Sequence, residues 1–195
     1  MHESSFLAME KFKNQYLDIN ATLNILDIGS FDSNQDSFNY GLLFNENNWN
    51  YYGMDIKEGP NVDLVVSDIY DWVEINDESY DVVVSGQAFE HMEFFWKAIV
   101  EIKRILKPEG LCCIIAPSTG PVHRNPYDCY RFTAEGMESM GKYAGLDVLE
   151  SYTQTSPIWN DSVLICQKSY SNHNLDNRLN NLEKKIDILL NEIKE

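Results

Sequence analysis

The stretch NILDIGSFDSN, residues 24–34, joins an apolar run to a sharp turn that carries an acid. The run leads into Asp27 and Gly29, as a strand does where it ends in a nucleotide-binding turn. A dinucleotide site would carry G-x-G-x-x-G, but the second and third glycine positions hold Phe31 and Asn34. Because those glycines let the backbone approach a pyrophosphate, the turn predicts a ligand that needs an acid and little room for phosphates.

Strand-like and helix-like patterns alternate along the rest of the chain. Near-continuous apolar runs suit parallel strands covered on both faces, and they occupy 24–28, 51–54, 62–66, 80–85 and 111–116. Helical spacing extends over 89–106, where Lys-Pro-Glu-Gly follows, and again from Thr133 to Gly145. Runs at 146–152 and 162–167 predict an antiparallel hairpin at the sheet edge. We therefore predict an α/β fold, Rossmann-like and doubly wound, with a mostly parallel seven-stranded sheet.

Composition narrows the classes of partner. The 195 residues carry a net charge of −16, which disfavours nucleic acid, and no Lys/Arg cluster stands out. No signal peptide is recognisable, and no run reaches the ~20 apolar residues that cross a bilayer, so we expect no membrane insertion. The four cysteines show no CxxC or zinc spacing and indicate reduced core thiols in a cytoplasmic protein. They are Cys112, Cys113, Cys129 and Cys166.

The ends of the chain differ from its centre. Residues 1–21 form a predicted N-terminal helical segment, residues 22–167 the main domain, and the polar residues 168–174 a linker. Over 175–195 the apolar residues follow a heptad seam, which predicts a coiled-coil helix that makes a homo-oligomer through 175–193, with a parallel dimer favoured. The alternative is an amphipathic helix that folds back on its own domain.

Ligands of open α/β sheets bind at the carboxyl ends of the strands. Asp27, Asp55 and Asp68 follow three such ends. Asp55 has the position of an acid that binds both ribose hydroxyls of an adenosine cofactor, and Asp68 could accept from an adenine amino group. S-adenosylmethionine has no phosphates, and its ammonium group suits an acid such as Asp27. The alternative is a tight strand-to-helix turn of an unrelated α/β protein.

The wider pattern resembles the class I S-adenosylmethionine-dependent methyltransferases over residues 22–167. The similar pieces are ILDIGS, YYGMDIKEGPNVDLVVSD, YDVVVSGQAFEHM and IVEIKRILKPEGLCCIIAPS. The resemblance implies the methyltransferase fold and S-adenosyl-L-methionine as the cofactor. The cofactor contacts that we predict are Asp27, Gly29, Ser30, Asp55, Ile56, Asp68, Ile69, Ser85 and Gln87.

A narrower resemblance is to small methyltransferases of glycan assembly. Those enzymes often carry G-S-x-D-x-N in the first motif and H-x-x-P-x-D-x-x-R-F after the fifth strand, and both patterns occur here, at 29–34 and 123–132. The resemblance implies O-methylation of a sugar hydroxyl on a small-molecule or glycan acceptor. An N-methyltransferase acting on an amine, and a non-catalytic cofactor-binding scaffold that recruits partners through its coil, stay open as alternatives.

Two histidines are candidates for chemistry. His91 follows the fourth strand and is the predicted base for a hydroxyl acceptor, although a histidine packed at a helix start would look the same. His123 lies in the loop PSTGPVHRNPYDCYRFT and is the second candidate. The predicted acceptor contacts are Arg124, Asp128, Tyr130, Arg131 and Trp159.

That loop has two further interpretations. An Asp128–Arg131 ion pair that merely staples the loop explains part of the pattern equally well. His123 and Asp128 could ligate a divalent metal, but two ligands are too few, so the sequence predicts no metal site.

Overall fold

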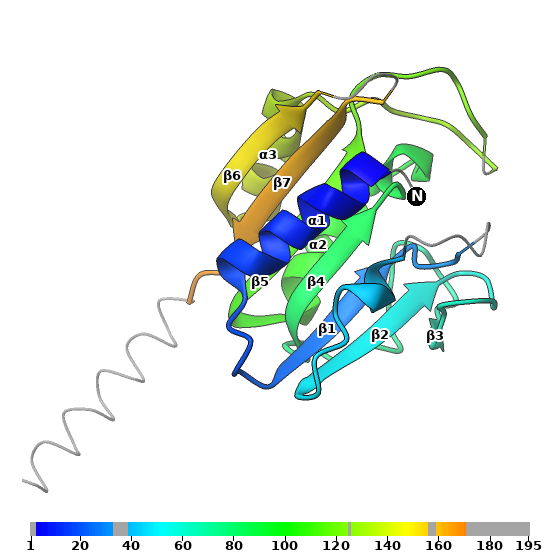
Figure 1. Ribbon diagram of the computed structural model, residues 1–195. Helices are drawn as coiled ribbons and strands as arrows, with labels where there is room; N and C mark the ends of the chain where they lie inside the picture. Colours follow the sequence, from blue (N-terminus) through cyan, green and yellow to red (C-terminus); the bar gives the residue numbers. More distant parts are fainter. Residues whose placement is uncertain (1–2, 33–38, 125, 156–158, 171–195) are drawn as a thin grey trace, which may run out of the picture.

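A computed structural model describes residues 3–32, 39–124, 126–155 and 159–170. These residues form a seven-stranded sheet with the order β3-β2-β1-β4-β5-β7-β6 (Figure 1). The first five strands in that order run parallel, and β7 is antiparallel to both β5 and β6. The predicted α/β architecture with its edge hairpin is confirmed. The strands are β1 Leu23–Ile28, β2 Trp49–Asp55, β3 Leu64–Val65, β4 Tyr80–Gly86, β5 Leu106–Pro117, β6 Asp147–Gln154 and β7 Asp161–Gln167.

Helices cover both faces of the sheet. In Figure 1, α1 (Glu3–Tyr16) lies in front of the sheet, while α2 (Phe95–Ile105) and α3 (Ala134–Ala144) lie behind it. Neighbouring strand residues alternate between the two cores, since side chains along a strand point to opposite faces. Cys112 packs in the α2/α3 core and Cys113 in the α1 core, as expected for buried thiols.

The cysteine prediction fails at one position. Cys129 is exposed, because it lies in an irregular loop and not in a strand.

The helix predicted over 89–106 is wrong in its first part. A short 3₁₀ turn, η2 (Phe89–His91), is followed by one extended residue, Met92, and by a turn at 93–94, and α2 begins only at Phe95. In a continuous helix the Glu90 carbonyl would accept from the amide four residues later. Here that carbonyl accepts from the amides of Cys129 and Tyr130, at 2.7 and 3.2 Å. The loop after β5 therefore ends the helical turn and exposes the segment between η2 and α2 to the site.

The helix expected between Thr133 and Gly145 is confirmed. The Thr133 hydroxyl accepts from the Gly136 amide at 3.1 Å, and Gly145 adopts the left-handed conformation that ends many helices. The strand after α2 begins earlier than predicted, because Lys107–Gly110 runs within β5 as an irregular stretch beside a register shift.

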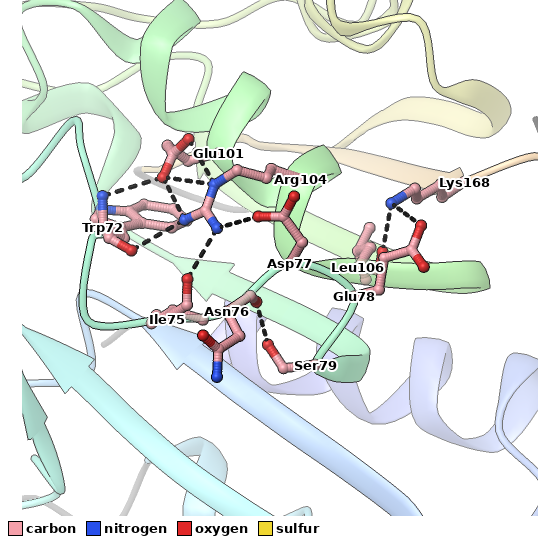
Figure 2. A network of polar contacts seen from close by, with 10 residues as sticks. All are labelled: Trp72, Ile75, Asn76, Asp77, Glu78, Ser79, Glu101, Arg104, Leu106 and Lys168. Carbon is pink, nitrogen blue, oxygen red and sulfur yellow. Dashed lines mark hydrogen bonds and ion pairs between the residues drawn. The ribbon is translucent and has the colours of Figure 1, made fainter.

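The connection between β3 and β4, residues 66–79, contains no helix. Arg104 of α2 holds it in place instead (Figure 2). Its guanidinium donates to the carbonyls of Trp72 and Ile75, at 2.9 and 2.8 Å, and pairs with Glu101 and Asp77, each at 2.7 Å. These contacts of Arg104 hold the connection in place, and the same connection positions Ile69 and Tyr70 at the edge of the site.

The predicted linker begins as part of the domain. Lys168 donates to the Leu106 carbonyl at 2.7 Å, and the Tyr170 hydroxyl donates to Glu109 at 2.8 Å. The rest of the linker and the predicted coiled coil, residues 171–195, lie outside the described residues.

None of the helices in the described segments has the length and apolar character that a membrane crossing requires.

Candidate active site

A cavity of about 630 Å³ opens at the carboxyl ends of β1, β2 and β4, where the strand order reverses. This is the location at which open α/β sheets bind ligands. It is bordered by the first turn, by η2 with the residues after it, and by the loop after β5. Of the predicted site residues, those that line it are Asp27, Gly29, Ser30, Asp55, Ile56, Ile69, Gln87, His91 and Arg124.

The first turn depends on one glycine. Gly29 has a φ of +74°, and a Cβ atom on it would lie 2.4 Å from the Cβ of Ala88. The ring of Phe31, at the second glycine position of the dinucleotide pattern, covers Gly59 in the loop after β2 and lines the cavity. The Ser30 hydroxyl donates to the Asn61 carbonyl at 2.7 Å. Side chains thus occupy the space that a pyrophosphate would need.

Asp27 is a buried acid at the end of β1. The residue is 3% exposed, and its carboxylate accepts a hydrogen bond of 2.6 Å from the Tyr51 hydroxyl. Burial raises the pKa of Asp27 to about 7; the Tyr51 hydrogen bond opposes this shift and the charge of Asp55 adds to it. A cation bound in the cavity beside Asp27 would therefore stabilise the ionised form of this carboxyl group.

Asp55 lies at the end of β2 and is half-buried. One carboxylate oxygen accepts from the Phe31 amide at 3.3 Å, and the other accepts from the Lys57 amide at 3.1 Å. Each carboxylate oxygen can accept more than one hydrogen bond, so both retain capacity for ligand hydroxyls. The backbone bonds fix the orientation of the carboxylate before any ligand arrives.

The other predicted cofactor contacts have different surroundings. Asp68 is exposed, does not line the cavity, and accepts from the Tyr70 amide at 2.7 Å. Ser85 is fully buried and donates to the Ile28 carbonyl at 2.9 Å, which ties β4 to β1. Gln87 lines the cavity and donates to Asp161 at 3.0 Å. Cofactor binding by Asp68 and Ser85 stays a prediction, and each of the two side chains makes a hydrogen bond to the backbone.

The two candidate catalytic histidines come together although 32 positions separate them. Their rings meet edge to face at 4.9 Å. Between them lies Glu90, whose side chain is fully buried. Its Oε1 is 3.6 Å from Nε2 of His91 and 3.9 Å from Nε2 of His123. Burial raises the pKa of Glu90 to about 8. Sequence reasoning missed Glu90, since an acid beside a histidine in a short turn gives no signal of its burial.

The loop after β5, residues 118–133, contains the Asp128–Arg131 ion pair that the sequence analysis offered as an alternative interpretation. Arg131 forms a two-pronged pair with Asp128, at 2.6 and 2.9 Å, and donates to the Pro121 carbonyl at 2.8 Å. This guanidinium holds the pKa of Asp128 well below its usual range. The backbone amide of His123 donates to the same carboxylate at 2.7 Å. The ion pair therefore sets the position of His123.

Most of the residues that we predicted to contact the acceptor pack against other residues of the protein. Trp159 packs against the ring of His123 at 5.0 Å and fills the space over Gly120. Tyr130 packs on Phe95 at 5.0 Å. Among the described residues, Asp128, Tyr130, Arg131 and Trp159 do not line the cavity, while Arg124 and the unpredicted Tyr127 do. Acceptor binding by those four stays a prediction.

The residues present fit S-adenosylmethionine. The cradle at Gly29 admits a ligand that lacks phosphates, Asp55 offers acceptors for a ribose, and Asp27 suits an ammonium group. The partly apolar wall of Ile56, Ile69 and Met92 suits an adenine.

Comparisons with known proteins agree with this fit. The methyltransferase domain family, Methyltransf_11, matches residues 38–114. No relative among curated proteins matches the chain. The match extends over less than half of the chain, from residue 38 into β5.

Solved structures share the fold at low sequence identity. An S-adenosylmethionine-dependent methyltransferase from Aquifex aeolicus is 15% identical with a TM-score of 0.59, covering 83% of this chain and 88% of its own. One from Methanosarcina mazei is 16% identical with a TM-score of 0.61, covering 81% and 97%. The [4+2]-cyclase SpnF is 14% identical with a TM-score of 0.66, covering 84% and 82%. The fold therefore carries more than one chemistry, and function has to be argued from the site.

Proposed function

We propose that this protein transfers a methyl group from S-adenosylmethionine to a sugar hydroxyl of a glycan or its precursor. The observation that carries the proposal is the composition of one cavity of about 630 Å³. It is lined by Asp27 and Asp55, which suit the cofactor, and also by His91, Arg124 and Tyr127, which suit a polar acceptor.

The cofactor end needs little more than positioning. When bound, S-adenosylmethionine supplies a methyl group on a positively charged sulfur. Asp55 would accept from the ribose hydroxyls through the oxygens that its backbone bonds hold in place. Asp27 would accept the ammonium group in a buried setting, where the attraction between opposite charges is strong.

The acceptor end of the cavity has hydrogen-bond donors and a histidine that can accept a proton. Arg124 and Tyr127 are exposed at the cavity and offer hydrogen bonds to several hydroxyls. A hydroxyl loses its proton as the new bond forms, and a positioned base assists that loss. The predicted base, His91, lines the cavity and is backed by the Tyr127 carbonyl, 2.5 Å from Nδ1. The sugar acceptor is supported by the resemblance of residues 123–132 to the loop motif of glycan-assembly methyltransferases.

The release of S-adenosylhomocysteine by the full chain tests this function. We expect turnover with sugars or nucleotide sugars and none with amines of similar size. His91→Ala should lower kcat by about 10²–10⁴ with little change in cofactor affinity. His123→Ala should mainly raise KM for the acceptor, because His123 does not line the cavity itself but packs against His91, which does. Glu10→Gln, an exposed change on α1, is the control and should change neither.

Turnover with amines alone would replace the hydroxyl acceptor by the N-methyltransferase alternative. Cofactor binding without turnover across the whole panel would favour the scaffold alternative.

A further inference from the structure

We propose that Glu90, His91 and His123 form a binding site for a divalent transition-metal ion. One candidate ligand atom from each residue lies within 4.8 Å of the other two. The site combines η2, which follows β4, with the loop after β5. The proposal does not rest on the proposed methyl transfer, since metal binding is measurable without cofactor or acceptor. The Nε2 lone pair of His91 cannot hold the ion and accept a proton at once, so the role of base belongs to the metal-free protein.

Glu90 is the first reason. Its side chain is fully buried, and neither carboxylate oxygen has a hydrogen-bond partner among the described groups. A buried carboxylate without a donor or counter-ion carries a large free-energy cost, so such groups in proteins are usually paired or bound to metals. The charge of Arg131 opposes the raised pKa of Glu90, but its two terminal nitrogens donate to Asp128 and to two backbone carbonyls, and its Nε donates to neither Glu90 oxygen. A cation between Glu90 and the two imidazoles would provide the missing partner.

The distances suit a shared ion. Oε1 of Glu90 lies 3.6 and 3.9 Å from the Nε2 atoms of His91 and His123. These separations are too long for hydrogen bonds. Metal bonds of about 2.1 Å at tetrahedral angles place ligand atoms about 3.4 Å apart. The three side chains therefore need shifts on the order of 1 Å or less to close on one ion.

The orientation of both imidazoles is the second reason. His91 directs Nδ1 at the Tyr127 carbonyl, 2.5 Å away, so Nδ1 carries the proton and the lone pair of Nε2 faces Glu90. His123 directs Nδ1 toward the carboxylate of Asp128, 3.7 Å away, and Nε2 toward Glu90. Metal-bound histidines almost always donate the other ring N–H to such an oxygen, as His91 does to the Tyr127 carbonyl. The Nδ1 of His123 would need to approach Asp128 by about 0.5 Å to make the same bond. Arg131, which fixes Asp128, is then a positioning residue for the site.

The ligand types select the class of ion. Mg²⁺ and Ca²⁺ prefer oxygen ligands, whereas two imidazoles with one carboxylate suit Zn²⁺ and related transition metals. Three protein ligands leave coordination positions open, as in catalytic zinc sites. His91 also lines the cavity. The ion would thus sit where the acceptor end of the cavity meets the cluster, and we take Zn²⁺ as the probe.

Calorimetry on the full chain, treated with a chelator and dialysed, tests the site. We expect Zn²⁺ to bind at one site per chain, and Co²⁺ in its place to give visible absorption bands from nitrogen and oxygen ligands. Glu90→Gln and His123→Ala should each weaken Zn²⁺ binding by more than about 100-fold, beyond the usual cost of losing an outer partner of a ligand. Glu10→Gln, the same chemical change at an exposed position on α1, should bind as the wild type does.

The thermal melt without metal shows whether each variant is folded. His123 is partly exposed, with 38% of its side chain accessible, so His123→Ala should fold even if Glu90→Gln does not. Absence of saturable Zn²⁺ binding in the wild type would overturn the proposal. Binding that survives in a folded Glu90→Gln or His123→Ala variant would also overturn it, because the ion would then lie elsewhere. Loss of methyl transfer with metal binding intact would count against the proposed function alone.

Discussion

Replacing Asp27 with asparagine should stabilise the protein at neutral pH and flatten part of its pH dependence. The carboxyl group is buried, and its pKa is raised from 3.8 to about 7. A shift of about three units corresponds to roughly 4 kcal/mol of free energy of unfolding, lost once the group is fully ionised. Asparagine keeps an oxygen that can accept from the Tyr51 hydroxyl, so the variant removes the charge and little else.

The sign follows from proton binding. Between pH 4 and 7 the folded state holds a proton on Asp27 that the unfolded state has released, so the contribution of Asp27 to stability falls as pH rises through this window. The groups that face Asp27 are Tyr51, Asp55 and Tyr40. Both tyrosines have raised pKa values and stay protonated throughout. Integrated from pH 5 to 8, the loss due to Asp27 is about 2–3 kcal/mol.

Urea denaturation of wild type and Asp27→Asn at pH 5, 6, 7 and 8 measures this difference. The advantage of the variant should grow by about 2–3 kcal/mol across that range. Tyr51→Phe is the matched variant: it removes the hydrogen bond that lowers the pKa of Asp27, so its loss of stability should extend to higher pH. Parallel stability curves for wild type and Asp27→Asn would refute the reasoning, since they would mean that folding does not raise the pKa of Asp27.

Four further outcomes are expected. S-adenosylmethionine should bind about fivefold more tightly at pH 7 than at pH 6, because Asp27 must ionise to hold the ammonium group, and calorimetry on Asp27→Asn should show no such change. Asp55→Ala should weaken that binding more than about tenfold by calorimetry, and NAD should not bind; unchanged affinity would remove Asp55 from the site. Arg104→Lys should lower the free energy of unfolding by about 1–3 kcal/mol in urea, since an ammonium cannot reproduce the fork; a loss below about 0.5 kcal/mol would count against the clamp. Light scattering should show an oligomer that becomes a monomer on truncation at Ser171, and a monomeric full chain would refute the coil predicted over 175–193.

The elements that sequence reasoning predicted are those with local causes. Near-continuous apolar runs identified β1, β2 and β4, because a strand covered on both faces needs apolar side chains in every position. The α3 helix was predictable at both ends, since Thr133 caps its first turn and Gly145 ends it. That Asp27 and Asp55 lie close together at one cavity was predictable, because strand ends in a parallel sheet meet at one edge.

The errors have distant causes. The break before α2 arises because the amides of Cys129 and Tyr130, nearly forty positions away in the sequence, donate to the Glu90 carbonyl. Helical periodicity carries no information about such a bond. The burial of Glu90 and the meeting of His91 with His123 depend on the same tertiary contact. The ion pair of Asp128 with Arg131 was an open alternative in the sequence, and only packing showed that it shapes the loop.

Transfer of an isotopically labelled methyl group tests the central claim most directly. The full chain is incubated with S-adenosylmethionine carrying a ¹³C methyl group and with the sugar that supports turnover, and the product is examined by carbon NMR. We predict that the label arrives on a sugar oxygen and that Asp55→Ala and His91→Ala slow its arrival. Label that arrives on nitrogen, or that stays on the cofactor with every acceptor, would contradict the account.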